Sequence, residues 1–182
     1  MKWQGRRIIL GVTGCVAIYK AVGLASRLTQ AGAEVEVVMT PAAKRFLTPL
    51  QFSAVTRRPT HHRLWREVTH QPGHIALAEW AELLVVAPVT ANTMAKITYG
   101  LADNLLTSVI LAASHKPLLL APAMNTGMWD AAATQDNLAQ LVRRGVATVG
   151  PGEGHLACGS TGKGRLAETE EIIAALERMV LA

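Results

Sequence analysis

Short apolar runs alternate along the chain with segments whose apolar residues recur every three to four positions. Runs of this kind, about four or five residues long and almost wholly apolar, are typical of parallel strands covered on both faces. The sequence therefore predicts five strands, over residues 8–12, 35–39, 83–87, 117–120 and 146–149.

The segments between these runs have the period of amphipathic helices. After the first strand, Ala17, Ala21, Leu24, Ala25 and Leu28 fall on one helical face, and Gly32 ends the pattern. Further helices are predicted from the turn at residues 40–43 to about residue 55, around residues 74–81, after Thr93, before the fourth strand, over 131–144 and over 168–179. The helix over 131–144 stops at Gly145, a residue type common just past a helix end.

Alternating strands and helices of these lengths imply right-handed crossovers between parallel strands. We therefore expect an α/β fold: a doubly wound, mostly parallel sheet of the Rossmann or flavodoxin-like type, with five or more strands and helices on both faces. Residues 1–182 are expected to form one domain.

Two segments depart from this alternation. The basic segment at residues 57–66 is expected to be a loop, mobile or packed on a neighbouring subunit, in which the adjacent His61 and His62 are solvated rather than metal-bound. Residues 150–165 contain five glycines after Gly150, with Cys158 between them, and such composition is typical of a flexible lid.

Composition narrows the class of protein. The chain has 182 residues, is 50% hydrophobic and carries a formal charge of +5. Only 4% of its residues are aromatic, which argues against a nucleic-acid surface. Cys15 and Cys158 lie far apart and outside any metal-binding spacing, so two free thiols in a reducing compartment are expected. The first apolar run is too short for a signal peptide or membrane span, and we expect a cytoplasmic protein.

Small and hydroxyl-bearing residues follow the predicted strands. The turn at residues 13–15 leads from a strand into a helix, an arrangement that favours an anion at the helix start. Thr40 and residues 90–93 occupy equivalent positions after the second and third strands. Each signal is weak alone, because the chain has neither a GxGxxG nor a Walker pattern, and threonines there also serve as helix caps.

The loop over residues 121–130 combines two methionines, a tryptophan and a lone asparagine after the fourth strand. Such a loop suits a flat apolar ligand held by one polar contact. Alternatively, Met124 and Trp129 belong to the core and Asn125 satisfies backbone groups. The residue types alone favour this second interpretation.

Five segments, taken in order, resemble the successive motifs of the homo-oligomeric flavin-containing cysteine decarboxylases. They lie at residues 11–20, 74–78, 87–93, 121–129 and 157–165, and so cover nearly the whole chain. Within that family the likeness is greatest to the coenzyme A branch, whose substrate is 4′-phosphopantothenoylcysteine.

The resemblance implies FMN as the cofactor. It places Gly14, Cys15 and Val16 at the phosphate, Ala123 near the ring, and further contacts at Thr40, Thr90, Ala91, Asn92 and Thr93. The family usually has glycine or serine where this chain has Cys15, so a hydroxyl contact to the phosphate is lost unless backbone amides replace it.

The same resemblance implies the catalytic roles. His74 is the base, Cys158 the proton donor, and Asn125 binds the substrate carboxylate, with Met128 and Ala157 also at the substrate. In the family mechanism the substrate is oxidised to a thioaldehyde, loses carbon dioxide and is reduced again as an enethiolate. No metal is implied.

The family assembles as trimers, or as larger assemblies such as trimers of trimers and dodecamers, with flavin sites between subunits. The loop over residues 124–129 is thereby expected to reach a neighbour's flavin. Some relatives are fused to a synthetase that makes the substrate. Two alternatives stay open: a peptide-cysteine decarboxylase of the lantibiotic type, and an inactive FMN-binding regulatory subunit.

Overall fold

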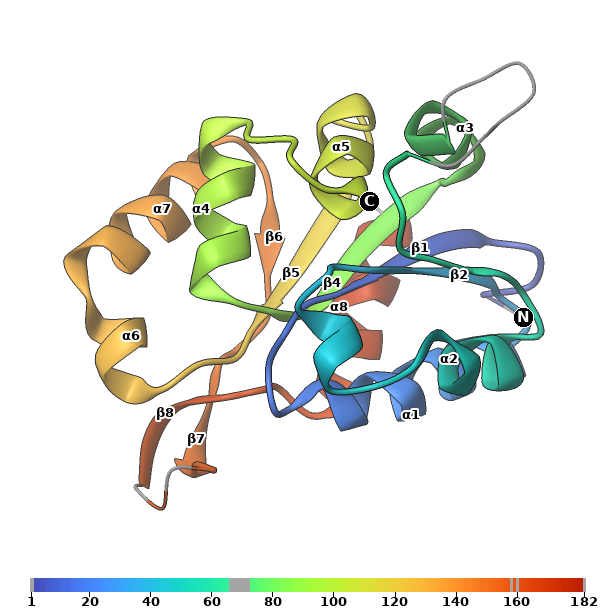
Figure 1. Cartoon of the computed structure of the whole chain (residues 1–182). Helices are drawn as coiled ribbons and strands as arrows, with labels where there is room; N and C mark the ends of the chain where they lie inside the picture. The colour runs from blue at the N-terminus through green and yellow to red at the C-terminus, as the bar shows by residue number, and fades with distance from the viewer. Residues whose placement is uncertain (1, 66–72, 158, 160, 182) are drawn as a thin grey trace.

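A six-stranded parallel sheet forms the centre of the molecule (Figure 1). The computed structural model describes residues 2–65, 73–157, 159 and 161–181. The strand order is β3-β2-β1-β4-β5-β6, so the chain builds outward in one direction and then, from β4, in the other. The strands are β1 (Arg7–Val12), β2 (Glu34–Met39), β3 (Thr60–His61), β4 (Leu83–Val89), β5 (Leu118–Pro122) and β6 (Ala147–Thr148). The predicted doubly wound sheet is confirmed.

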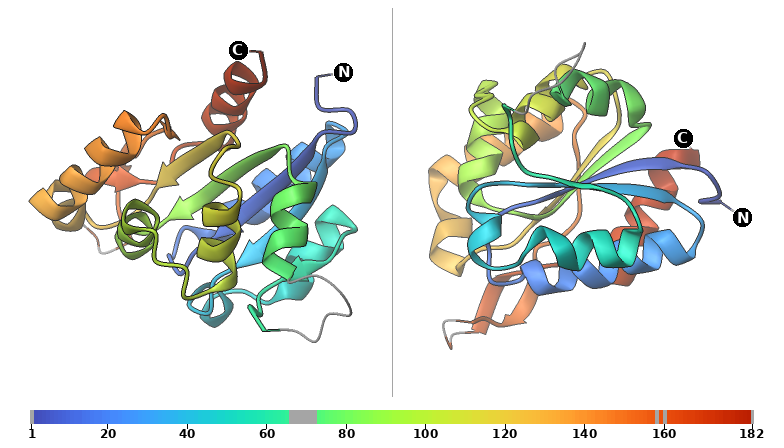
Figure 2. Two further views of the ribbon diagram at one scale, coloured as in Figure 1. Left: turned by 90° about the horizontal axis from the view of Figure 1, so that it is seen from above. Right: turned by 45° about the vertical axis from the view of Figure 1, so that its right-hand side comes forward.

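Helices cover both faces of the sheet, as Figures 1 and 2 show. One face carries α1 (Ile18–Gln30), α2 (Pro49–Thr56) and α8 (Thr169–Leu181). The other carries α3 (Gly73–Trp80), α4 (Ala91–Tyr99), α5 (Leu105–Ala112) and α7 (Ala132–Arg143). None of the helices within the described ranges is long and apolar enough to cross a membrane.

Successive side chains of β1 point to opposite faces of the sheet and pack into both helical layers. Ile8 and Leu10 pack with the helices of the first face, and Ile9 packs with those of the second. Gly11 also faces the second layer, where a Cβ would lie 2.5 Å from Cδ1 of Leu106. The missing side chain therefore lets α5 lie close to the sheet.

The helix predicted from residue 40 to about residue 55 is interrupted. Only a single 3₁₀ turn, η1 (Ala43–Arg45), forms before α2 begins at Pro49. Thr48 is extended because it precedes proline, and it forms a capping box in which its amide donates to Oε1 of Gln51 at 3.0 Å. Proline at the first helical position thus starts a new helix.

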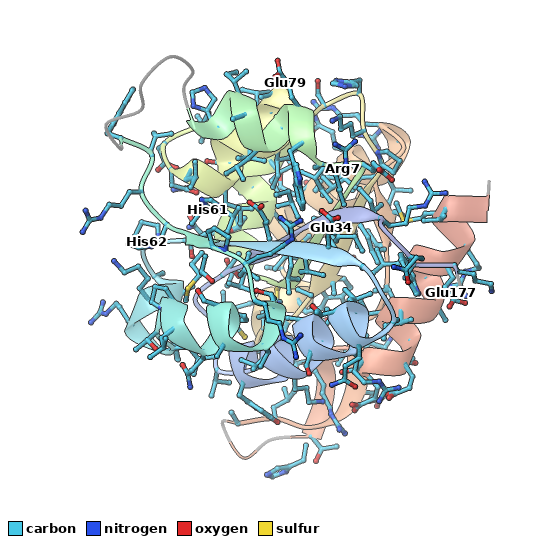
Figure 3. All side chains as sticks on the ribbon, turned by 90° about the vertical axis from the view of Figure 1, so that its right-hand side faces the viewer. Arg7, Glu34, His61, His62, Glu79 and Glu177 are labelled. Carbon is cyan, nitrogen blue, oxygen red and sulfur yellow. The ribbon has the colours of Figure 1, made fainter. Side chains whose placement is uncertain are left out.

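The described part of the basic segment after α2 is mostly irregular, as predicted, but ion pairs hold part of it against β2. Its residues 60 and 61 form β3, the edge strand beside β2. Arg58 pairs with Glu34 and Glu36 of β2, and its guanidinium lies 5.3 Å from the Trp80 ring centre. His61 Nε2 lies 2.8 Å from Oε2 of Glu36, so this histidine is paired rather than solvated. Figure 3 labels His61 together with Glu34 of the neighbouring β2.

The glycine-rich segment after β6 forms a hairpin in its described part. The strands β7 (Gly152–His155) and β8 (Thr161–Arg165) pair antiparallel and project from the sheet (Figure 1). The prediction that residues 150–165 are irregular is therefore wrong for the residues of β7 and β8. Glycine supplies no alternation of apolar and polar side chains, so the strand signal was missing.

Candidate active site

Four neighbouring parallel strands, β2, β1, β4 and β5, end at the same edge of the sheet. The predicted cofactor residues follow these ends: residues 14–16 follow β1, Thr40 follows β2, residues 90–93 follow β4, and Ala123 follows β5. The strand order reverses between β1 and β4, which is where open α/β sheets bind ligands. The structure therefore brings these residues to one edge.

Thr13 joins the ends of β1 and β4. Its side chain is buried, and its Oγ1 donates to the Pro88 carbonyl at 2.8 Å and accepts from the Thr90 amide at 3.1 Å. The Ala123 amide in turn donates to the Val89 carbonyl at 3.1 Å. The loops after β1, β4 and β5 are thus held together by hydrogen bonds.

The turn after β1 is compact because of Gly14 and Cys15. A Cβ on Gly14 would lie 2.6 Å from the Cβ of Ala42, so a larger residue would push the loop after β2 away. The Cys15 thiol donates to the Ala123 carbonyl at 3.5 Å. Burial raises the pKa of this thiol, against a smaller lowering by a hydrogen bond with the Ala17 backbone, so it stays protonated at neutral pH.

Two helices begin at this edge with different caps. The first residue before α1, Ala17, makes no side-chain cap, and the first turn contains no acidic residue. The turn at 14–16 and the start of α1 are therefore suited to a phosphate group. At α4, by contrast, Thr90 Oγ1 accepts from the Thr93 amide at 3.3 Å. Thr90 therefore caps α4. Thr40 Oγ1 accepts from the Ala43 amide at 3.2 Å and so holds the turn that leads into η1.

A cleft of about 550 Å³ opens between the start of α1, the loop after β5 and the β7–β8 hairpin. We call it the Asn125 cleft. Five of the predicted site residues line it: Cys15, Val16, Ala123, Asn125 and Ala157. A second cavity, of about 410 Å³ between α4, α5 and α7, contains none of the predicted site residues.

The hairpin closes one side of the Asn125 cleft through backbone contacts with the loop after β5. The Met124 amide donates to the Gly164 carbonyl at 3.0 Å, and Thr126 Oγ1 donates to the Lys163 carbonyl at 2.8 Å. A Cβ on Gly164 would lie 2.1 Å from the Met124 carbonyl oxygen, so only glycine permits this approach.

The loop over residues 121–130 contains a short helix, α6 (Thr126–Asp130), and serves two purposes. Met124 and Trp129 pack against the core, as the second interpretation predicted. Asn125 is exposed and caps α6, its Oδ1 accepting from the Gly127 amide at 2.8 Å. Met128 is half exposed on α6 and does not line the Asn125 cleft.

His74 lies elsewhere. It occupies the first turn of α3 and lines a shallow cleft, here called the His74 cleft, with Leu64, Trp65, Ile75 and Leu111 among its neighbours. The described lining residues of the two clefts do not overlap, so one chain does not bring His74 to Asn125. Cys158 lies outside the described residues.

The sequence analysis gave no role to two cations of the Asn125 cleft, Lys20 and Arg165. Both lie inside segments that carry the family resemblance, at residues 11–20 and 157–165. Their position in those segments was the only hint in the sequence that they belong to the site. The sequence could not show that they lie in one cleft, because α1 and β8 are far apart along the chain.

Comparisons with known proteins agree with this geometry. The family model described as Flavoprotein matches residues 2–181. The coenzyme A biosynthesis bifunctional protein CoaBC of Vibrio cholerae is 47% identical over 174 residues, covering 95% of this chain and 43% of its own length. The chain therefore spans less than half of that relative. The probable phosphopantothenoylcysteine decarboxylase of Streptococcus mutans is 41% identical over 177 residues, covering 96% of this chain and 99% of that protein.

Solved structures show the same fold. A PPC decarboxylase variant complexed with pantothenoylaminoethenethiol superposes with a TM-score of 0.90 at 34% identity, covering 98% of this chain and all of the other. The FMN-binding protein AtHal3 has a TM-score of 0.84 at 35% identity, with 97% of each chain covered.

Proposed function

The chain belongs to the Flavoprotein family, and from this membership we propose that it is an FMN-dependent carboxy-lyase converting 4′-phosphopantothenoylcysteine to 4′-phosphopantetheine in coenzyme A biosynthesis. The observation that carries the proposal is the Asn125 cleft, which joins the phosphate-suited turn at 14–16 to Asn125 and Ala157. The match to the Streptococcus mutans relative over nearly its full length supports the same reaction.

The residues at the strand ends fit FMN. Gly14 lets the turn pack closely against the loop after β2, the start of α1 lacks a side-chain cap, and residues 90–93 lie at the adjacent strand end. Backbone amides of the turn would hold the phosphate where Cys15 replaces a hydroxyl, and the small, buried Ala123 would approach the ring. When bound, FMN supplies a two-electron acceptor and donor, which side chains do not provide.

The side chains divide the remaining tasks. His74 accepts a proton from the substrate near neutral pH, as imidazole does. Asn125, oriented by its bond to the Gly127 amide, binds the substrate carboxylate without a permanent charge that would stabilise the ground state. Met128 and Ala157 contact the substrate, and Cys158 delivers the final proton to the substrate carbon.

A second copy of the chain is part of the proposal, because His74 and Asn125 lie in different clefts. Two large apolar side chains that line the His74 cleft are exposed, Trp65 at 85% and Leu111 at 50%. Such a patch suits burial against another subunit. We infer a homotrimer or a larger assembly of trimers, in which one copy's His74 cleft completes another's Asn125 cleft.

The surroundings of the enzyme follow from the same relatives. Residues 1–182 are proposed to be one flavoprotein domain in the cytoplasm. The synthetase that makes the substrate is either fused to it, as in the bifunctional relatives, or separate.

The test is mass spectrometry of the product after anaerobic incubation of the yellow holoenzyme with 4′-phosphopantothenoylcysteine. Loss of carbon dioxide alone is expected, and His74→Asn should abolish it while flavin absorbance persists. A peptide ending in cysteine serves as a parallel substrate. Turnover of the peptide alone would identify a peptide decarboxylase, and turnover of neither by a flavin-loaded protein would favour a regulatory subunit.

A further inference from the structure

Two cations from distant parts of the chain meet at the rim of the Asn125 cleft. Lys20 projects from the first turn of α1, and its side chain is only 17% exposed. Arg165 is the last residue of β8, on the hairpin side of the cleft. Both line the cleft, whose described lining residues include no aspartate or glutamate. A substrate entering here meets a positively charged rim.

A single carboxylate holds the two cations together. Lys20 Nζ lies 3.2 Å and 3.1 Å from the two carboxylate oxygens of Glu168, and Arg165 Nη2 lies 2.5 Å from one of them. These contacts lower the pKa of the Glu168 carboxyl, with Lys20 as the main cause, so Glu168 is ionised at neutral pH. Two positive charges facing one negative charge leave the cluster with a net charge of +1.

This arrangement matches the chemistry of a phosphate monoester. Such a group carries about −1.5 to −2 charges at neutral pH and has three acceptor oxygens, so it neutralises two cations better than one carboxylate does. Arginine offers a fork of donors to phosphate and lysine offers a compact charge. The Glu168 carboxylate itself is half exposed, and ion pairs to such carboxylates contribute little to stability, so replacing it with a phosphate costs little.

The neighbours of Lys20 and Arg165 point to the substrate's phosphate rather than the cofactor's. Their cleft contains Asn125 and Ala157, which the proposed function assigns to the substrate. It also contains Cys15, Val16 and Ala123 of the cofactor site, but neither Thr40 nor residues 90–93 line it. The cofactor phosphate already has a suitable place at the uncapped start of α1.

We propose that Lys20 and Arg165 form the subsite that binds the phosphate of the substrate, with Glu168 holding the two cations in place until the substrate arrives. The subsite rests on the proposed function, because that function supplies a substrate with a phosphate. It gives the enzyme a physical reason to prefer phosphorylated substrates over their unphosphorylated analogues.

The test compares 4′-phosphopantothenoylcysteine with pantothenoylcysteine. The holoenzyme should show a higher kcat/KM for the phosphorylated substrate, and Lys20→Met and Arg165→Met should each lower the ratio of the two values by roughly tenfold or more, as expected for loss of a charged hydrogen bond. The matched control is Arg27→Met. It removes another ion pair between α1 and α8, that of Arg27 with Glu170 at 3.1 Å, outside the cleft, and should keep the ratio.

Two outcomes would overturn the subsite. Equal losses of kcat/KM on both substrates would mean that the two cations do not bind the phosphate. Loss of bound FMN from Lys20→Met, measured by flavin absorbance, would assign Lys20 to the cofactor phosphate instead.

A binding experiment separates the subsite from the proposed function. Calorimetry with 4′-phosphopantetheine and pantetheine needs no turnover, and the ratio of their Kd values should shrink in both variants. If the native protein turns over neither substrate but the ratio of Kd values still shrinks in the variants, the subsite stands and the proposed reaction fails. Unchanged Kd ratios overturn the subsite whatever the turnover.

Discussion

Single residues at the sheet edge are defined by their partners more than by their type. Cys15 lies in the turn predicted to hold a phosphate, yet its thiol donates to the Ala123 carbonyl. Thr40 and Thr90, predicted as ligand contacts, both accept hydrogen bonds from nearby backbone amides: Thr90 caps α4, and Thr40 holds the turn before η1. The sequence order predicted that these residues meet at one edge of the sheet, and only the structure shows which of their groups already have hydrogen-bond partners.

The half-buried Cys15 thiol should react slowly with iodoacetamide. Burial raises its pKa above the ordinary value of 9.0, so the reactive thiolate is scarce at pH 8 and its reaction rate should still be rising above pH 9. Peptide mapping by mass spectrometry across a pH series measures the rate, with the denatured chain as the control. A rate that levels off below pH 9 would contradict the buried environment.

At the scale of elements, the sequence predicted what apolar periodicity encodes. The four long strands, β1, β2, β4 and β5, and the main helices follow that signal, and their order implies that residues 14–16, 90–93 and 123 meet. The two-residue β3 depends on ion pairs of Arg58 with β2, and the hairpin depends on glycine backbone contacts, neither of which has a periodic signature. The separation of His74 from Asn125 was also invisible, because periodicity does not tell which cleft a helix start faces.

Thr13→Val tests how strongly the ends of β1 and β4 depend on one hydroxyl. The change keeps the shape but leaves the buried Pro88 carbonyl and Thr90 amide without this partner, so the free energy of unfolding should fall by about 1–3 kcal/mol. Urea denaturation of the FMN-free protein measures it.

Thr29→Val is the control for that experiment. Thr29 is half-buried on α1 and donates only to the carbonyl of Ala25, one turn earlier in the same helix, at 2.9 Å. Its substitution should change the free energy of unfolding by less than about 0.5 kcal/mol. Equal losses at the two positions would show that Thr13 is not a special link between strands.

At the scale of the whole molecule, the two clefts act as two halves of one proposed site. A single chain carries both halves but does not bring them together. We therefore expect activity only where two copies are in contact. Variants that are inactive for different reasons should then complement each other.

Subunits of His74→Asn and Asn125→Ala, each inactive alone, should regain activity when coexpressed. Random mixing in equal amounts places an intact His74 opposite an intact Asn125 in about a quarter of the contacts, so about a quarter of native activity is expected. The measurement is decarboxylation by the purified mixed oligomer. As a control, a chain carrying both substitutions should restore no activity when coexpressed with His74→Asn. If the first mixture also recovers no activity, His74 and Asn125 act in the site of one chain.

The close approach of Gly164 to Met124 also limits how this protein can diverge. At φ +140° and with no room for a Cβ, position 164 excludes every side chain, whatever ligand the cleft binds. Exposed lining residues such as Tyr19 and His155 carry no such restriction. New substrate preferences can therefore arise by exchanging the side chains of the cleft, while its outline is inherited unchanged.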